Sequence, residues 1–242
     1  MNEKDESRPV QDASRREALS RERILREAIE MIDRDGLQAV TMRSLGARMD
    51  VAAMALYRYV NGREDLLEGV VQTLVDEVHV DPEGNLGPHD GWQALLQWLA
   101  HSVRQVAVEH PAIFPLIATR HPAAPWLRPP LRSLRVVEEF LQGLTERGFT
   151  DKQAVRTYRI FTSFLIGHLL LEAAASGAST APMDEPLDEG DADIPPPSET
   201  VEVSDYPTIA RTAEMLAEDH TQEEFEQALE ALLDRLDHEL SQ

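Results

Sequence analysis

The chain has 242 residues, of which 44 are acidic and 23 basic, and its formal net charge is −21. It contains no cysteine, which excludes disulfide bonds, thiol nucleophiles and thiolate metal sites. No apolar run reaches the roughly 18 residues that a membrane-spanning helix needs, and the polar N-terminus does not resemble a signal peptide, so we expect a cytoplasmic protein without membrane contact. The low aromatic content and the many Leu, Ala and Glu residues favour an all-α fold, with one large or two modest domains.

The first segment with a clear helical pattern covers residues 20–35. Ser20 is a suitable N-cap, and Gly36 is a suitable residue for the C-terminal end. Apolar residues recur at helical spacing between them, namely Ile24, Leu25, Ala28, Ile29 and Ile32. The preceding residues 1–14 are polar, and we expect them to form a disordered arm.

Residues 41–67 indicate two short helices joined by a tight turn, followed by the start of a longer helix. Leu45 and Met49 lie one turn apart on the first helix, and Leu56 and Val60 lie one turn apart on the second. Each helix therefore has one narrow apolar stripe, which is stable only against a neighbour. The second helix exposes mostly Ala, Tyr and Arg opposite its stripe, as a helix-turn-helix that enters a DNA major groove does.

The order and spacing of about fifty residues carry a specific resemblance. The matching residues are Gly36-Leu37, Val40-Thr41, Arg43-Ser44-Leu45, Met49-Asp50-Val51, Ala55-Leu56-Tyr57-Arg58-Tyr59-Val60 and Arg63-Glu64-Asp65-Leu66-Leu67. This segment resembles the DNA-binding domain of TetR-family transcriptional regulators. The resemblance implies a three-helix helix-turn-helix domain at 15–64 that binds a pseudo-palindromic operator in double-stranded DNA as a homodimer.

The resemblance also implies which residues contact DNA. They are Thr41, Arg43, Ala53, Met54, Ala55, Tyr57, Arg58, Tyr59 and Arg63. Tyr57 is the strongest candidate, although it could instead pack on the neighbouring helix.

Two residues depart from the family pattern. Asp50 replaces the usual Gly of the turn and tolerates a left-handed conformation less readily. Ala52 stands where a capping Ser or Thr is common, and the loss of such a cap costs about 1 kcal/mol. The small side chains of Ala52, Ala53 and Ala55 leave few bidentate base contacts, so thymine methyl groups and DNA shape are expected to contribute more to specificity.

The charge is distributed unevenly along the chain. Residues 1–63 contain 12 basic and 11 acidic residues, a net charge of +1, whereas the remainder contains 11 and 33, a net charge of −22. The acidic remainder repels phosphate, so DNA contacts are expected in the amino-terminal part. The candidate phosphate or base contacts are Arg15, Arg16, Arg43, Arg48, Arg58 and Arg63. Some of them could instead pair with Glu residues of the first helix.

Helical patterns continue beyond residue 67, interrupted by segments of other composition. The long helix runs to about residue 79, and residues 81–91, rich in Gly and Pro, form a joint between domains. Further helices are expected at 91–108 with Asp90 as the cap, 112–119, 131–147, 151–175, 207–218 and 221–240. Thr41 is a suitable cap for the helix that follows it, Asn61 with Glu64 resembles a capping arrangement, and Thr150 with Gln153 and Thr221 with Glu224 are possible capping boxes. Residues 176–205 contain nine acids, no bases and three consecutive prolines, a composition typical of a mobile loop.

This second part resembles the regulatory domain of tetracycline-repressor-like proteins. The resemblance depends on Gly91-Trp92, His110-Pro111, ERGF at 146–149, FLIGHLLLEAAA at 164–175 and FEQALEALLDRL at 225–236. It implies a helical ligand-binding and dimerisation domain at 65–242, with a dimer formed by the 151–175 helix and the final helix. Two late helices with wide apolar faces also need a partner surface on physical grounds.

Regulatory domains of this kind enclose a mostly apolar pocket with a few polar groups. Residues of suitable type are Trp98, His101, Phe114, His121, Trp126, Phe140, Tyr158, Phe161 and His168. For each aromatic the alternative is ordinary core, and His168 could be a core or dimer-interface histidine. The spacing of His101, His110 and His121 specifies no metal, and we predict neither a metal nor a cofactor.

The sequence favours a regulator over an enzyme. It contains no GxSxG, no HExxH and no phosphate-binding loop. We predict a transcriptional repressor that a small-molecule effector releases from DNA. The alternative is a DNA-binding regulator controlled by a protein partner without an inducer, which a very small or fully packed pocket would favour.

Overall fold

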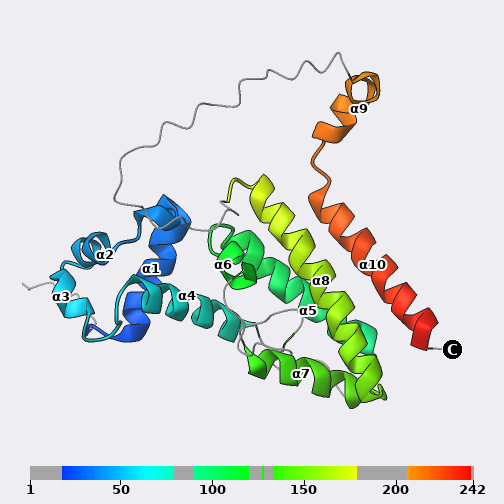
Figure 1. Cartoon of the computed structure of the whole chain (residues 1–242), viewed down its shortest axis with the longest axis horizontal. Helices are drawn as coiled ribbons and strands as arrows, with labels where there is room; N and C mark the ends of the chain where they lie inside the picture. Colours follow the sequence, from blue (N-terminus) through cyan, green and yellow to red (C-terminus); the bar gives the residue numbers. More distant parts are fainter. Residues whose placement is uncertain (1–17, 79–89, 120–126, 128–132, 179–205, 241–242) are drawn as a thin grey trace, which may run out of the picture. The chain divides into compact units, whose positions relative to one another are not determined.

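The computed structural model describes residues 18–78, 90–119, 127, 133–178 and 206–240, and within these ranges all regular structure is helical (Figure 1). The all-α prediction is therefore confirmed. The chain divides into two compact units, Met1–Thr73 and Leu74–Gln242. The predicted domain boundary, 64/65, lies near the start of the helix within which the units meet. The predicted arm at 1–14, most of the joint at 81–91 and most of the acidic loop at 176–205 lie outside the described residues.

The first unit is built from short helices around one core. It contains α1 (Arg21–Asp35), the 3-10 turn η1 (Leu37–Ala39), α2 (Met42–Arg48), α3 (Ala53–Leu56) and most of α4 (Arg63–Glu77). The apolar faces predicted from helical spacing are the buried ones. The fully buried side chains include Ile24, Ala28, Ile32, Leu45, Leu56, Leu66, Leu67, Val70 and Val71.

Local capping defines where these helices begin. The Ser20 hydroxyl accepts a hydrogen bond from the backbone of Arg23 at the start of α1, as predicted. Thr41 caps α2, also as predicted. At the turn before α4, the predicted pairing of Asn61 with Glu64 is wrong. Asp65 instead accepts from the Asn61 backbone N–H at 2.8 Å and from its side-chain amide at 3.2 Å.

The second unit is organised around its longest helix, α8 (Asp151–Ala175). The other helices are α5 (Trp92–Glu109), α6 (Phe114–Thr119), α7 (Leu134–Thr145), α9 (Pro207–Ala217) and α10 (Thr221–Leu240). Helix α8 packs against α5, α6, α7 and α10, and Figure 1 shows α10 running beside it. The core contains Leu96, Leu99, Phe114, Phe140, Phe161, Leu165 and Phe225.

Two of the predicted helix starts differ in detail. The N-cap of α5 is Gly91, without a side-chain cap, rather than Asp90. At α10, the Asp219 carboxylate accepts from the backbone and hydroxyl of Thr221, so Thr221 does not itself act as the cap. The Thr150 and Gln153 capping box of α8 is confirmed.

A search of the helices in these described ranges finds none that is both long and apolar enough to cross a membrane.

Candidate nucleic-acid interface and internal cavity

A very close approach of backbones joins α2 to α3. A Cβ atom on Gly46 would lie 3.0 Å from the carbonyl oxygen of Val51 and 3.2 Å from the Cα of Ala53, so a larger residue here would have to move the neighbouring backbone by a few tenths of an ångström. The Val51 backbone N–H donates to the Gly46 carbonyl at 2.9 Å. Asp50, between them, has φ +56°, the left-handed conformation in which the family pattern usually places glycine.

Helix α3 has only four residues and a weak start. Its N-cap is Ala52, which makes no side-chain cap hydrogen bond, so the expected missing cap is confirmed. Leu56 and, after the helix, Val60 are buried in the core of the first unit. Burial of these two apolar side chains holds α3 in place, because the helix has no side-chain hydrogen bond at its N-terminus to do so.

The opposite face of α3 presents large side chains to solvent. Met54 is 75% exposed and Tyr57 46% exposed, and Arg58 and Tyr59 are also exposed. Ala53 and Ala55 are half-buried and short. The surface therefore combines one apolar side chain, two phenol rings and one cation, with small residues that let a groove edge approach the backbone.

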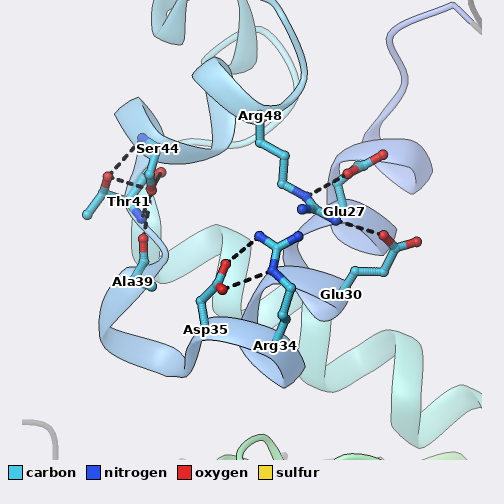
Figure 2. Close-up of polar contacts among 8 residues, drawn as sticks. All are labelled: Glu27, Glu30, Arg34, Asp35, Ala39, Thr41, Ser44 and Arg48. Carbon is cyan, nitrogen blue, oxygen red and sulfur yellow. Dashed lines mark hydrogen bonds and ion pairs between the residues drawn. The ribbon is translucent and has the colours of Figure 1, made fainter.

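The arginines of this unit fall into two groups. Arg48 bridges α2 to α1, because its Nε lies 3.0 Å from Oε2 of Glu27 and its Nη2 lies 2.9 Å from Oε2 of Glu30 (Figure 2). The half-buried Arg63 donates from Nε to the Val40 carbonyl at 2.9 Å and from Nη2 to the Leu37 carbonyl at 3.0 Å. Both guanidinium groups therefore have structural partners.

Arg43 and Arg58 are different. Both are exposed, and among the described residues neither has an ion pair or a side-chain hydrogen bond. An exposed guanidinium without a protein partner is available for a phosphate oxygen or a base edge. Arg15 and Arg16 lie outside the described residues.

Thr41 is exposed and also has a structural role. Its hydroxyl accepts from the Ser44 backbone N–H at 3.0 Å, and the Ser44 hydroxyl in turn donates to the Ala39 carbonyl at 2.7 Å (Figure 2). This capping box fixes the start of α2. If Thr41 contacts DNA as predicted, it does so with a hydroxyl oxygen that also accepts the N-cap hydrogen bond of α2.

Arg21 connects α1 to the segment that follows α3. Its Nη1 donates to the Tyr59 carbonyl at 2.8 Å, and its Nη2 lies 2.8 Å from Oδ1 of Asp65. The hydrogen bond from this guanidinium lowers the pKa of the Asp65 carboxyl and raises that of Arg21. The pair holds both ends of the exposed segment against α1.

The second unit contains a small apolar cavity of about 80 Å³. Its walls come from α5, α6, α7 and α8, together with Leu74, Val75 and Val78 near the end of α4. Among the described residues, the polar side chains that line it are those of Tyr158 and Thr162, and none of the described lining side chains is charged. Burial raises the pKa of Tyr158 to about 12, so its phenol is uncharged at neutral pH.

The predicted pocket residues are distributed between several places. Phe114, Phe140, Tyr158 and Phe161 line the cavity, whereas Trp98, His101 and His168 do not. His121 and Trp126 lie outside the described residues. Spacing along single helices did not separate these groups, because the cavity wall depends on which face of each helix meets α8.

His101 and His168 instead surround the fully buried Phe225 of α10. The two imidazole rings lie 6.0 and 5.3 Å from the Phe225 ring. The Arg104 guanidinium lies over the same ring at 5.1 Å and forms a bidentate ion pair with Glu172. Sequence reasoning missed this cluster, whose members come from α5, α8 and α10. Across the described residues, no group of three His, Asp or Glu side chains is placed to hold a metal ion.

Together these features define an all-helical protein with an N-terminal helix-turn-helix and a helical second unit. Residues 24–70 match the family "Bacterial regulatory proteins, tetR family", and residues 85–240 match "Tetracyclin repressor-like, C-terminal domain". The chain belongs to the TetR family.

Individual relatives agree with this assignment. An HTH-type transcriptional regulator of Saccharopolyspora erythraea is 26% identical over 69% of this chain, which spans 66% of that protein's length. The tetracycline repressor protein class A from transposon 1721 of Escherichia coli is 25% identical over 88% of each chain. These relatives are regulators, not enzymes.

A solved structure extends the comparison to the fold. A crystal structure of a possible TetR family transcriptional regulator from Streptomyces coelicolor A3(2) is 30% identical to the chain, with a TM-score of 0.68. The match covers 90% of this chain and 99% of that one.

Proposed function

We propose that this protein is a sequence-specific transcriptional repressor, that it binds a pseudo-palindromic operator as a homodimer, and that a small molecule releases it from DNA. The observation that supports DNA binding most directly is the exposed face of α3. Met54 and Tyr57 stand out from a short helix whose other face, at Leu56, is completely buried. An exposed methionine flanked by the small residues Ala53 and Ala55 can pack on an apolar base edge in a DNA groove.

Each exposed residue of this face has a chemical role in the proposal. Arg43 and Arg58 contact phosphates or base edges, and Tyr57 donates a hydrogen bond from its phenol. Ala53 and Ala55 allow close approach to the groove, where Met54 meets an apolar base edge and Tyr59 borders the backbone. Arg63 supports the interface indirectly, by holding the turn that precedes α2.

Dimerisation is supported by apolar side chains that the single chain leaves uncovered. Leu171 on α8 is 74% exposed, and Ile209, Met215 and Leu216 on α9 are also exposed. Large exposed apolar groups on two helices of one unit favour association with a second copy. A two-fold dimer presents its two α3 helices to the two halves of a palindrome.

Ligand-driven release is supported by the position of α4. Leu74, Val75 and Val78 line the cavity, while Leu67 and Val70 of the same helix are buried in the first unit. A ligand that displaces the end of α4 therefore acts on a helix that is continuous with the DNA-binding unit. A difference of about 1–3 kcal/mol in ligand affinity between two states is typical of such coupling.

The size of this cavity, taken alone, is compatible with a second candidate function, although a second pocket of about 310 Å³, lined in part by Tyr158, Glu138 and Arg159, also lies in the second unit. The volume of the first cavity, about 80 Å³, is below the roughly 300–1,000 Å³ of ordinary ligand pockets. A regulator without an inducer, controlled by a protein partner or by its own concentration, needs no larger cavity.

Selection from random DNA duplexes tests the first part of the proposal. The full-length protein should enrich one palindromic sequence, and a salt titration should show a steep loss of affinity as phosphate contacts are screened. If only weak, salt-sensitive binding without enrichment is found, the protein is not a sequence-specific regulator.

The selected operator then separates the two candidates. A library of small molecules is screened for release of labelled operator, measured by fluorescence anisotropy. Release by a compound that also raises the melting temperature of the free protein supports an inducer. If no compound does both, the regulator without an inducer is the better description.

A further inference from the structure

Within the described residues, two buried threonines of α8, Thr157 and Thr162, lack the backbone hydrogen bond that Thr73 and Thr212 make, and of these two only Thr162 lines the cavity. The hydroxyls of Thr73 and Thr212 each donate to the backbone carbonyl four residues earlier, at 2.9 Å, which is the usual solution for Thr in a helix. Thr162 is only 6% exposed and lines the cavity, yet no hydrogen bond to its hydroxyl is found in the described part of the chain.

The Thr162 oxygen nevertheless retains access to empty space. Within the described residues, no side-chain polar atom is both completely buried and without a partner. The unpaired hydroxyl of Thr162 therefore keeps some accessible surface, and Thr162 is one of the residues that line the cavity. A buried hydroxyl without a partner is unfavourable, and a ligand atom that pairs with it removes this penalty.

The rest of the cavity wall excludes charge. In the described part of the chain, Leu, Ile, Val and Phe side chains form it, apart from Tyr158 and Thr162, which lie one turn apart on α8. Transfer of an ionised carboxylate or ammonium into such surroundings is strongly unfavourable without an opposite charge. A metal chelate would meet the same obstacle, because no carboxylate or imidazole of the described residues lines the wall.

The volume adds a condition on how the ligand enters. A cavity of about 80 Å³ is roughly half of the ~150 Å³ that accommodates benzene in an engineered apolar cavity. A ligand the size of one ring therefore has to push its walls apart. Leu74, Val75 and Val78 of α4 belong to that wall, so expansion displaces α4.

We propose that the effector is an uncharged, mainly apolar molecule with one hydrogen-bonding oxygen or nitrogen, and that this atom pairs with the Thr162 hydroxyl. The inference rests on the proposed function of a ligand-released regulator and specifies the chemical class of the ligand. Thr162 then selects among neutral ligands, and the apolar wall rejects charged ones.

Three small probes of nearly equal shape test this proposal. Acetophenone has a carbonyl oxygen, α-methylstyrene replaces that oxygen with a CH₂ group, and benzoate carries a charge on the same planar skeleton. Binding to the full-length protein is measured by titration calorimetry at millimolar probe concentrations, and release of the selected operator is measured by anisotropy. The variant is Thr162→Val, which keeps the shape and removes the hydroxyl. The matched control is Thr212→Val on α9, outside the cavity.

We expect the wild-type protein to bind acetophenone about 5–10 times more tightly than α-methylstyrene, the ratio that one hydrogen bond supplies. Benzoate should bind at least about 100 times more weakly, because its charge must be desolvated without an ion-pair partner. Thr162→Val should abolish the preference for acetophenone, whereas Thr212→Val should keep it. Thr162→Ser, which restores a hydroxyl, should also keep the preference and provides the test if the Val variant does not fold.

Three outcomes would overturn the inference. They are benzoate binding as tight as that of acetophenone, an acetophenone preference that survives Thr162→Val, and failure of all three probes to bind. Operator binding is measured without probes in the same series. If the wild-type protein does not bind the operator without probes, the proposed function itself is refuted. If it binds the operator but does not bind the three probes in the expected order of affinity, only the ligand class is refuted.

Discussion

Replacement of Arg63 by Ala and replacement of Arg43 by Ala should affect different properties, although a TetR-type pattern places both residues at the DNA interface. The Arg63 guanidinium donates to two backbone carbonyls, those of Leu37 and Val40. The Arg43 guanidinium is exposed, and within the described residues it has no protein partner. We therefore expect Arg63→Ala to lower stability and Arg43→Ala to lower only DNA affinity.

The two hydrogen bonds set the size of the effect at Arg63. A hydrogen bond from a charged donor contributes about 1.5–3 kcal/mol when buried. Because Arg63 is half-buried, water partly replaces the lost bonds, and a combined loss of about 2 kcal/mol is reasonable for both. For a unit of fewer than 100 residues this corresponds to a decrease of roughly 8–16 °C in the melting temperature.

Arg43→Ala should change the free energy of unfolding by less than about 0.5 kcal/mol, as exposed substitutions usually do. If Arg43 contacts a phosphate, the slope of log affinity against log salt should fall by about 0.9 in magnitude. Differential scanning calorimetry measures the first quantity, and anisotropy with the selected operator over a sodium chloride series measures the second.

The reverse pattern would refute this reasoning. If Arg63→Ala melts like the wild type but loses one unit of salt slope, its guanidinium serves DNA rather than the protein backbone. If Arg43→Ala melts early, the exposed guanidinium has a structural role that its contacts do not indicate.

Four further predictions concern other parts of the chain. Asp50→Gly should raise the free energy of unfolding by about 1 kcal/mol, seen in urea titration, because Asp50 has φ +56° and glycine adopts this conformation without strain; unchanged or lower stability would contradict it. If Met54 packs on a thymine methyl group, Met54→Ala should weaken operator binding about 3–10-fold. Replacement of the contacted thymine by uracil should then weaken operator binding by the wild-type protein but not by the variant. Arg104→Met should lower stability by about 2–3 kcal/mol, because Glu172, only 12% exposed, loses its ion-pair partner; the double variant with Glu172→Gln should recover part of this loss. Acidification should destabilise the first unit, because the Arg21 guanidinium beside Asp65 lowers the pKa of the Asp65 carboxyl in the folded state. The stabilisation from this pair is fully present above the pKa of Asp65 in the unfolded chain and is lost as the pH falls through its pKa in the folded protein. Asp65→Asn should reduce this pH dependence of the free energy of unfolding.

Local sequence determined the helices and several of their ends. The apolar spacing at Leu45, Leu56 and Val60 predicted which faces are buried, because helical periodicity is a property of neighbouring residues. The caps at Thr41 and Thr150 and the strained turn at Asp50 were predicted for the same reason. These features depend on residues within four positions of one another, and the printed sequence contains them directly.

The tertiary structure alone decided which polar groups are available for function. Arg48 and Arg63 pair with groups 18 to 26 residues away in the chain, whereas Arg43 and Arg58 have no such partner among the residues that the structure describes. In the second unit, α8 places Tyr158 and Thr162 on the cavity and His168 against Phe225. The type of a residue and its spacing from other residues do not show whether its side chain will contact a partner in the folded protein or line a cavity. The difference arises only when distant helices pack, because packing selects which side chains lose their contact with water.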